Sequence, residues 1–448
     1  FLPAVLWAHA TAPSDTAWTG NGMRVCAAPG AQSQNTMTSD GAGGAYVGWW
    51  DSRDGTFDVY LQHLSPAGTP AVGWPSAGLL LRANANTYAY EEVSVVRDDA
   101  GGAIVGWLDN RANGSGGGRQ DIYAQRVSSS GVALWPSGGV RVTGSNTVYS
   151  CYQMTSDGAG GALFSWEDER SPSYTDHAYA QRIDASGQVL WAPDGVSTNV
   201  ATTASQWCPR VVSDGAGGAI VSWTDQRYLA TGGGSAVFAQ RLNASGVPQW
   251  PDTGLAVYAG TSQYGSYLQM AADGAGGALI ATEGSVRRWS PAGLLVWGAA
   301  VPYTGLTVTA RTWILADGSG GAIAAWANNK WSPVPDSSIY VEHFNAAGTP
   351  QWGWRLACSG AKSSSPVSMI PDGAGGAVLA WEDGRSGPGT SPPYSFMDIY
   401  AQRITSSGAI APGWAAAGRA ICTVDSSQRS PTVITDGSGG AIVVWTDW

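Results

Sequence analysis

The chain repeats one short pattern eight times, and this repetition limits its fold more than any other feature. Each copy has an aspartate, a glycine-rich turn and an aliphatic run that ends in tryptophan in all copies but one, as in SDGAGGAYVGW (39–49) and SDGAGGALFSW (156–166). The turn aspartates are Asp40, Asp98, Asp157, Asp214, Asp273, Asp317, Asp372 and Asp436. Repetition at this spacing is typical of proteins built by adding structural units to one body.

Each repeat is predicted to form four antiparallel strands. A short β-branched run precedes the turn, the aliphatic run follows it, and a third segment such as DIYAQRV (121–127) alternates apolar and polar residues. A last segment, such as LWPSGGVRV (134–142), contains a tryptophan and a glycine-rich turn. One such sheet cannot bury its own faces, and radial stacking of four-stranded sheets solves this problem.

The two ends of the chain carry complementary halves of one repeat. Residues 1–26 resemble the third and fourth strands, whereas residues 427–448 supply only the first and second. We therefore predict an all-β fold, a single eight-bladed β-propeller domain over 1–448, in which 1–26 and 427–448 form the closing blade. A solenoid would instead need polar caps at its ends, and a pair of sandwiches is the other alternative.

Composition excludes some classes of function. The net charge is −10 and there is no run of basic residues, so nucleic acid is not an expected partner. No stretch is apolar over the ~18 residues that a membrane-spanning helix requires. Phe1 to Trp7 are predicted to be either the remainder of a signal peptide or the first strand.

Five cysteines leave two interpretations open. Cys26, Cys358 and Cys422 end the fourth strand of their repeats, while Cys151 and Cys208 open the strand that follows. They are either small buried apolar residues or members of one or two disulfides between neighbouring blades. The odd number leaves at least one thiol unpaired within the chain.

The order of the repeat resembles that of quinoprotein-type propellers with tryptophan-docking repeats. SSPVSMIPDGAGGAVLAW (364–381), DIYAQRITSSG (398–408) and Trp414 follow that order. The resemblance implies that the first strand is innermost and that a fourth-strand tryptophan docks between blades. These tryptophans are Trp18, Trp74, Trp135, Trp191, Trp250, Trp297, Trp352 and Trp414. The vicinal cysteines of the quinone enzymes are absent, so no cofactor is expected, and the sequence is more similar to non-catalytic bacterial surface proteins with Asp-Gly-x-Gly-Gly repeats.

A second motif, Trp-x-Asp-x-Arg, follows the aliphatic strand in five repeats, as in Trp166, Asp168 and Arg170. It predicts either a repeated ligand clamp or, as we prefer, an Asp–Arg pair that locks neighbouring blades together. The turn aspartates each bring one carboxylate, whereas calcium needs six to eight oxygens, so turn formation is the preferred interpretation. Four histidines without metal-ligand spacing predict neither a zinc site nor a Ser-His-Asp triad.

The fifth repeat departs from the others. Thr282, Gly284 and Val286 replace the Trp, Asp and Arg of the second motif, and the following loop is nearly absent. We expect a notch at this point of one rim, unless the change is sequence drift.

Candidate binding residues lie in the crossovers between repeats. Long loops and crossovers are expected on one face, because the strands alternate in direction, and loops on a rigid scaffold often carry function. The proposed ligand-binding residues are Tyr90, Glu91, Tyr152, Trp207, Tyr264, Tyr267 and Trp313. Aromatic rings with carboxylates suit sugar or peptide ligands, although packing against the inner strands is the alternative.

Three functions follow from these patterns. The preferred one is a non-catalytic, secreted or surface-exposed bacterial propeller that recognises a glycan or a protein on its long-loop face. The second is a polysaccharide-acting hydrolase or lyase, with acids such as Glu91, Glu92, Glu167 and Glu169 as candidates; Glu167 and Glu169 are otherwise expected to point outward from a strand-end loop. The third is a structural module of a longer surface protein or assembly. No catalytic residue, metal site or cofactor is assigned.

Overall fold

The computed structural model describes most of the chain. The described residues are 4–10, 21–86, 93–111, 120–144, 148, 151–170, 175–199, 204–228, 233–259, 268–282, 284–301, 312–330, 336–359, 368–385 and 396–448. The described part contains no helix of the length and apolarity needed to cross a bilayer. Its regular structure consists of antiparallel strands, as the repeat predicts.

The fold is a β-propeller whose blades are four-stranded antiparallel sheets. Seven blades each use four consecutive strands, and a further sheet in the order β2-β1-β32-β31 combines both ends of the chain. The chain divides into two compact units, with Phe1–Thr56, Tyr60–Leu80 and Ala300–Trp448 in unit 1 and Phe57–Val59 and Leu81–Ala299 in unit 2.

The predicted count of eight blades is therefore corrected: seven blades have four consecutive strands, and the further sheet combines both ends of the chain. The described chain also divides into two compact units. The repeats read alike in both units, so the sequence carries no signal for this division.

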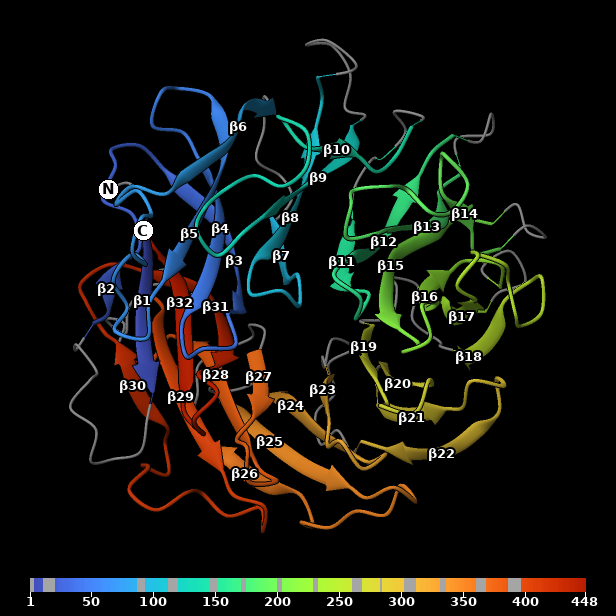
Figure 1. Cartoon of the computed structure of the whole chain (residues 1–448). Coiled ribbons are helices and arrows are strands. Elements are labelled where there is room, and N and C mark those ends of the chain that lie inside the picture. The colour runs from blue at the N-terminus through green and yellow to red at the C-terminus, as the bar shows by residue number, and fades with distance from the viewer. Residues whose placement is uncertain are drawn as a thin grey trace. The chain divides into compact units, whose positions relative to one another are not determined.

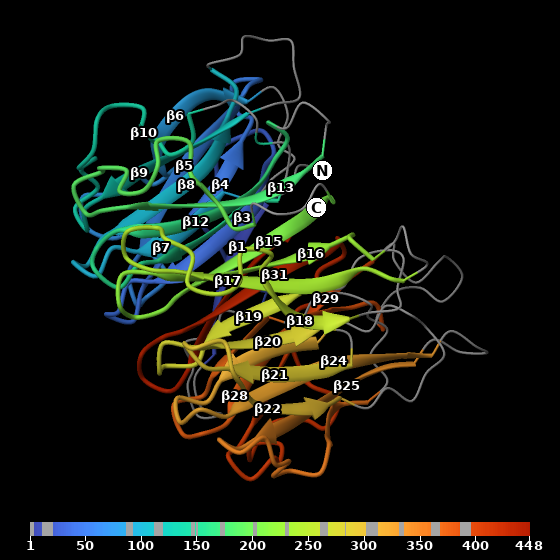
Figure 2. The same ribbon diagram turned by 90° about the vertical axis from the view of Figure 1, so that its right-hand side faces the viewer.

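Unit 2 holds four complete blades. Their strands are β7 (Ser94–Arg97), β8 (Ala103–Asp109), β9 (Asp121–Val127) and β10 (Val140–Arg141); β11 (Gln153–Ser156), β12 (Ala162–Asp168), β13 (His177–Ile183) and β14 (Val196–Ser197); β15 (Gln206–Ser213), β16 (Ala219–Asp225), β17 (Ala236–Leu242) and β18 (Leu255–Ala259); and β19 (Gln269–Ala272), β20 (Ala278–Thr282), β21 (Ser285–Trp289) and β22 (Leu295–Ala300). Figure 2 shows β19 to β22 side by side in this order.

Unit 1 holds two blades of consecutive strands and the composite sheet. The strands are β23 (Thr312–Ala316), β24 (Ala322–Lys330), β25 (Asp336–Phe344) and β26 (Arg355–Cys358); β27 (Ser368–Pro371), β28 (Ala377–Asp383), β29 (Asp398–Ile404) and β30 (Arg419–Cys422); and β1 (Ala4–Ala10), β2 (Met23–Arg24), β31 (Gln428–Thr435) and β32 (Ala441–Asp447). The remaining blade, whose residues are divided between the units, has β3 (Gln32–Ser39), β4 (Ala45–Asp51), β5 (Phe57–Leu64) and β6 (Leu79–Asn86).

The composite sheet joins the two ends of the chain. β1 pairs with β32 from Ala4 opposite Asp447 to Ala10 opposite Ala441, and the N and C labels lie close together in Figure 1. This is the pairing that the complementary half repeats at the two ends predict. The opening strand thus supplies the ladder hydrogen bonds that β32 would otherwise leave unmade at its edge.

The second strand of each blade is buried because it lies between the first and third strands and between neighbouring sheets. In β8, β12, β16 and β28 every residue is buried, which matches their near-continuous aliphatic sequences. The third strands carry apolar residues on alternate positions and a polar Gln-Arg pair at their ends. The core is therefore a series of clusters between sheets, such as the one around Leu163, Val211 and Val221.

Tryptophans on the fourth segment dock onto the next blade, as the family resemblance implies. The indole N–H of Trp135 donates to the carbonyl oxygen of Ala185 at 3.1 Å, and that of Trp250 donates to Pro291 at 3.0 Å. Trp352 makes the same bond to Ser406 at 2.9 Å. Each indole therefore contributes both apolar area and a satisfied N–H to the contact between two sheets.

The fifth repeat forms a shorter hairpin than the others. β20 and β21 have five residues each, and Thr282 pairs directly with Ser285 across the turn. Their hydroxyl oxygens lie 2.8 Å apart, in place of the Trp-x-Asp-x-Arg contacts of other blades. The hairpin of β20 and β21 is therefore shorter at this rim, and for this reason we expect a notch there.

Candidate functional site

The Trp-x-Asp-x-Arg motif forms a closed cluster inside one blade. The indole N–H of Trp166 donates to Oδ2 of Asp168 at 2.9 Å, and Nε of Arg170 donates to Oδ1 at 2.8 Å. The guanidinium of Arg170 lies 3.9 Å from the centre of the Tyr179 ring and donates to the carbonyl oxygen of Asp194 at 2.7 Å. All these groups belong to the blade of β11 to β14.

Other copies of the motif reach a neighbouring blade: Asp109 also accepts from Nε of Arg82 in the preceding blade at 3.1 Å, and Arg385 donates to Sγ of Cys358 in the preceding blade at 3.1 Å. Asp168 and Arg170 do not form the predicted lock between neighbouring blades. The two residues are separated by one position, so the arginine folds back over the aromatic residue of its own third strand. Burial alone would raise the pKa of Asp168, but the hydrogen bond and charge of Arg170 hold it below its ordinary value. The carboxylate is ionised, paired and buried, which is the arrangement of a structural ion pair.

The turn aspartates are also fully engaged. Oδ1 of Asp157 accepts hydrogen bonds from the backbone N–H groups of Ala159 and Gly161, both at 2.8 Å. Oδ2 of Asp157 accepts one from Arg182 at 2.9 Å, and Arg182 also donates to the carbonyl oxygen of Gly217 in the next blade at 2.7 Å. The turn aspartate therefore shapes its own hairpin and positions an arginine that bridges two blades.

Two histidines replace that arginine in unit 1. His63 lies 3.0 Å from Asp40 and His343 lies 2.9 Å from Asp317, each through Nε2. Burial would raise the pKa of Asp40, but the hydrogen bonds from His63 and the turn backbone lower it. The same causes lower the pKa of Asp317.

Four of the proposed ligand-binding residues lie outside the described residues: Tyr90, Glu91, Tyr264 and Tyr267. Trp313 lies in β23 and packs against the core cluster that contains Ile323 and Trp381. Tyr152 directly precedes β11 and is buried. Its hydroxyl donates to the carbonyl oxygen of Gly106 at 2.8 Å and accepts from the N–H of Ser94 at 3.1 Å. Tyr152 therefore joins two blades, and its hydroxyl is occupied.

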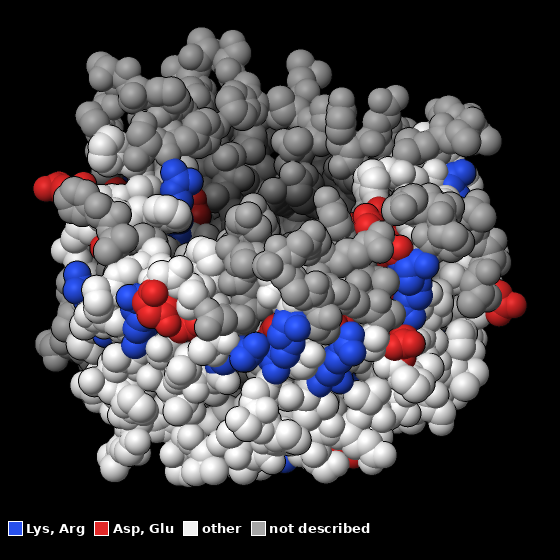
Figure 3. Space-filling model, turned by 90° about the horizontal axis from the view of Figure 1, so that it is seen from above, with Lys and Arg blue, Asp and Glu red and all other residues white. Residues whose placement is uncertain are grey.

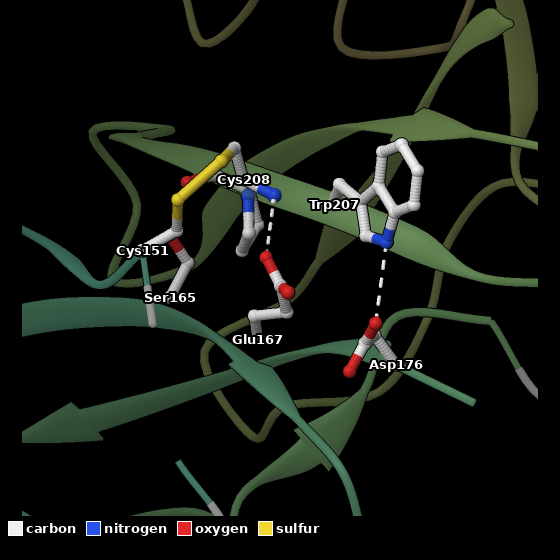
Figure 4. Close-up of a disulfide and its surroundings, with 7 residues drawn as sticks. Cys151, Ser165, Glu167, Asp176, Trp207 and Cys208 are labelled. Carbon is white, nitrogen blue, oxygen red and sulfur yellow. Dashed lines mark hydrogen bonds between the residues drawn. A yellow bond between two sulfur atoms is a disulfide. The ribbon is translucent and has the colours of Figure 1, made fainter. Parts of the chain in front are cut away.

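Among the described residues that we proposed for ligand binding, Trp207 has the surroundings that best suit a ligand. It lies at the start of β15, is half-buried, and donates from Nε1 to Oδ2 of Asp176 at 3.2 Å. The neighbouring Gln206 is fully buried: its backbone N–H donates to the carbonyl oxygen of Asp176 at 2.8 Å, and its Oε1 accepts from Ala178 at 2.9 Å. We call Asp176, Gln206 and Trp207 the Trp207 site (Figure 4 shows Trp207 and Asp176).

Two buried polar atoms of the Trp207 site have no hydrogen-bond partner among the described residues. They are Oδ1 of Asp176 and Nε2 of Gln206. At the same repeat position in two other blades the glutamine Nε2 has an acceptor: Nε2 of Gln32 donates to Gly30 at 2.9 Å, and Nε2 of Gln428 donates to Ser426 at 2.8 Å. One buried acceptor, on Asp176, and one buried donor, on Gln206, are therefore unpaired.

His177 borders the Trp207 site at the first position of β13. Burial lowers the pKa of His177 below its ordinary value, against the opposing charges of Asp168 and Asp176. The imidazole is therefore neutral at neutral pH, and the residue adds no positive charge to the site.

A disulfide between Cys151 and Cys208 joins the blades of β11 to β14 and β15 to β18 next to Trp207 (Figure 4). Their Cα atoms are 5.0 Å apart, and both residues have a positive φ, 49° and 44°. This decides between the two interpretations of the cysteines for one pair, while Cys26, Cys358 and Cys422 are buried and form no disulfide.

Glu167 lies beside this disulfide. It was expected to point outward from a strand-end loop, but it is buried in β12, and its Oε2 accepts from the N–H of Cys208 at 3.1 Å. The expectation was wrong because the ladder of β12 continues through Asp168 and turns Glu167 toward the next blade.

Sequence reasoning missed Asp176, Gln206 and the pairing of Cys151 with Cys208. One signal was available for the cysteines: each stands six positions before its turn aspartate, Asp157 or Asp214, in consecutive repeats. Equivalent positions on adjacent blades lie close together, so this register favours a bridge. Asp176 lies in a loop of irregular sequence and carried no such signal.

The charged side chains of the described surface are dispersed. On the face drawn in Figure 3, Lys and Arg side chains form separate groups, several of them beside Asp or Glu. Among the described side chains on that face, there is no continuous basic surface of the kind that binds a nucleic-acid backbone.

Comparisons with known proteins do not assign the chain to a family. No family model matches the chain, and no curated protein matches it. Among solved structures, the chain is similar to the polysaccharide lyase Uly1, with a TM-score of 0.48 and 10% identity over 99% of this chain and 97% of that one. It is also similar to Sqt1 from Chaetomium thermophilum, with a TM-score of 0.49 and 11% identity over 94% and 98% of the two chains. At these identities and TM-scores, neither similarity indicates a function for the chain.

Proposed function

We propose that the chain is a non-catalytic, secreted or surface-exposed propeller that binds a glycan at the Trp207 site. The observation that carries the proposal is the pair of unpaired polar atoms, Oδ1 of Asp176 and Nε2 of Gln206, on the hydrogen-bond partner and the chain neighbour of the half-buried Trp207. A buried polar atom without a partner costs about 1–3 kcal/mol, which a bound ligand recovers by supplying the missing hydrogen bond.

The chemistry of these groups suits a sugar better than a peptide side chain. A sugar hydroxyl donates and accepts, so neighbouring hydroxyls can satisfy a carboxylate oxygen and an amide N–H together. The C–H face of a pyranose packs on an aromatic ring, which Trp207 offers. A protein ligand that presents a serine or an amide to the same atoms is the second form of this binding function.

The acids near the site support binding over catalysis. Hydrolysis of a glycosidic bond uses two carboxyl groups about 5–10 Å apart that are open to substrate. Here Asp168 is paired with Arg170, and Glu167 accepts from Cys208. Neither Asp168 nor Glu167 therefore offers Asp176 an open acidic partner for catalysis.

The disulfide supports a location outside the cytoplasm. Structural disulfides persist in oxidising compartments and are rare in reducing ones. The bond between Cys151 and Cys208 joins two blades at the rim that carries Trp207, so it favours the secreted or surface location.

A glycan array with the full chain tests the proposal. We expect binding to at least one class of glycan, and we expect Trp207→Ala and Asp176→Asn to weaken it tenfold or more. Trp354→Ala is the matched control, because Trp354 is an exposed tryptophan that does not belong to the Trp207 site. Release of new reducing ends or unsaturated sugars would support the hydrolase or lyase alternative. A folded protein that binds no glycan would contradict the proposal and favour a structural module.

A further inference from the structure

Three metal-ligating side chains converge between two blades of unit 2. The sulfur atoms of Cys151 and Cys208 and a carboxylate oxygen of Glu167 all lie within 4.8 Å of one another. Glu167 comes from β12, Cys208 from β15, and Cys151 precedes β11. In the oxidised protein the two sulfurs are joined, and the carboxylate lies against the backbone of Cys208.

We propose that reduction of this disulfide creates a zinc site formed by Cys151, Cys208 and Glu167. A dithiol reductant supplies the two electrons and two protons: the S–S bond breaks, two thiols form, and the dithiol becomes a cyclic disulfide. Zn²⁺ then binds both sulfurs and the carboxylate, and two protons leave to solvent. The product is a centre with three protein ligands and a fourth position for water.

The dimensions fit this metal. Zinc–sulfur bonds of about 2.3 Å and zinc–oxygen bonds of about 2.1 Å place tetrahedral ligand atoms roughly 3.5–3.8 Å apart. Ligand atoms within 4.8 Å of one another need only small side-chain movements to reach that spacing. Two thiolates favour a soft or borderline ion such as Zn²⁺ over calcium or magnesium, which prefer oxygen ligands.

The protein holds the carboxylate in place before metal arrives. The N–H of Cys208 donates to Oε2 of Glu167 at 3.1 Å, which fixes the acid beside the sulfur of the same residue. Both cysteines are half-buried, so solvent reaches the pair, whereas Glu167 itself is buried. A partly accessible site with one fixed ligand loses less entropy when metal binds.

Other blades repeat the backbone conformation of Cys151 and Cys208, but they have no cysteine at that position. Gln34 and Ser430 stand six positions before their own turn aspartates and also have a positive φ of 53°. The N–H of Ser430 donates to Oε1 of Glu382 at 2.6 Å, which repeats the contact between Cys208 and Glu167. Glu382 is therefore a matched control that has the same structural contact and no sulfur ligand.

The experiment is a cobalt and zinc titration of the full chain before and after reduction. A phosphine reductant is used because it does not compete for zinc as a dithiol does. Cys26, Cys358 and Cys422 are replaced by serine to remove the other thiols. If that variant does not fold, the wild-type chain is used, and metal protection of each cysteine from alkylation is read by peptide mass spectrometry. Circular dichroism checks that the reduced protein remains folded.

We expect one Co²⁺ per chain only after reduction, with a thiolate-to-cobalt charge-transfer band that Zn²⁺ removes. Cys208→Ser abolishes the band, Glu167→Gln weakens binding about tenfold or more, and Glu382→Gln leaves it unchanged. Three results would overturn the proposal: no metal binding by the reduced and folded chain, equal binding before reduction, or equal losses from Glu167→Gln and Glu382→Gln.

Discussion

The indole N–H of Trp191 donates a hydrogen bond to the backbone carbonyl oxygen of Ala244 at 3.0 Å and thereby joins two neighbouring blades. Gly246, two residues further along, has a φ of 77°, and a Cβ there would lie 2.7 Å from the Trp191 ring. The indole is thus seated against a turn that only glycine fits. The same relationship recurs at Trp135, Trp250 and Trp352, so cohesion between blades depends on a repeated, specific contact.

Replacing Trp191 with alanine tests this contact. We expect a loss of about 3–5 kcal/mol in the free energy of unfolding, because the substitution removes a buried indole and leaves a cavity between two blades. Denaturant unfolding followed by circular dichroism measures the change. Leu294→Ala is the control: that side chain is 68% exposed and should change stability by less than about 0.5 kcal/mol. Equal effects of the two substitutions would refute the docking role.

The buried carboxylate of Asp168 gives a second prediction. Asp168→Asn leaves the guanidinium of Arg170 without its ionised partner, and we expect a loss of about 3 kcal/mol. Asp184→Asn is the control, because Asp184 is part of a surface turn and asparagine keeps the accepting oxygen. Thermal unfolding of the two variants measures the difference. Unchanged stability of Asp168→Asn would show that the ion pair contributes nothing.

The lowered pKa values predict a loss of stability in acid. Asp40, Asp168 and Asp317 have folded-state pKa values below their ordinary value of about 3.9. The unfolded chain therefore binds more protons near that pH, so this contribution is complete above about pH 4 and is lost as the pH falls through the folded values. Melting temperatures between pH 7 and pH 2.5 should fall steeply below pH 4. The fall should be shallower in Asp168→Asn, and equal slopes would contradict the assignment.

Cys26, Cys358 and Cys422, which form no disulfide, should not be alkylated in the native protein. Burial raises the pKa of Cys422 to about 11 and raises the pKa of Cys26 as well, so few thiolates exist at neutral pH. Iodoacetamide should label none of Cys26, Cys358 and Cys422 before unfolding and all three after it, as counted by mass spectrometry. Five labels should follow reduction and unfolding. Rapid labelling of the native chain would show that these thiols are accessible.

The strands of the blades can be predicted from the sequence more fully than the Trp207 site can. The turn aspartates and the aliphatic strands recur with a fixed phase, which predicts the four-stranded sheets and the pairing of β1 with β32. The burial of individual side chains is harder to predict from the sequence. Tyr152 was predicted to be an exposed aromatic residue of a crossover, yet it lies between two blades, where its hydroxyl hydrogen-bonds to Gly106 and Ser94.

Trp207 was proposed as a binding residue from its crossover position, but its hydrogen-bond partner could not be predicted from the sequence. Asp176 lies more than one strand away along the chain, in a loop with no repeat signal, and only the stacking of two blades brings it to Trp207. Gln206 occurs at a repeat position where Nε2 of Gln32 and Nε2 of Gln428 have acceptors, so its unpaired Nε2 depends on three-dimensional neighbours that the sequence does not specify.

Calorimetric titration of the best glycan from the array into the wild-type chain, Trp207→Ala and Trp354→Ala tests the proposed binding function most directly. We expect saturable glycan binding without product formation in the wild type and in Trp354→Ala. We expect the affinity of Trp207→Ala for the glycan to be at least tenfold weaker. Undiminished binding by a folded Trp207→Ala protein, or cleavage of the glycan during the titration, would contradict the proposed binding function.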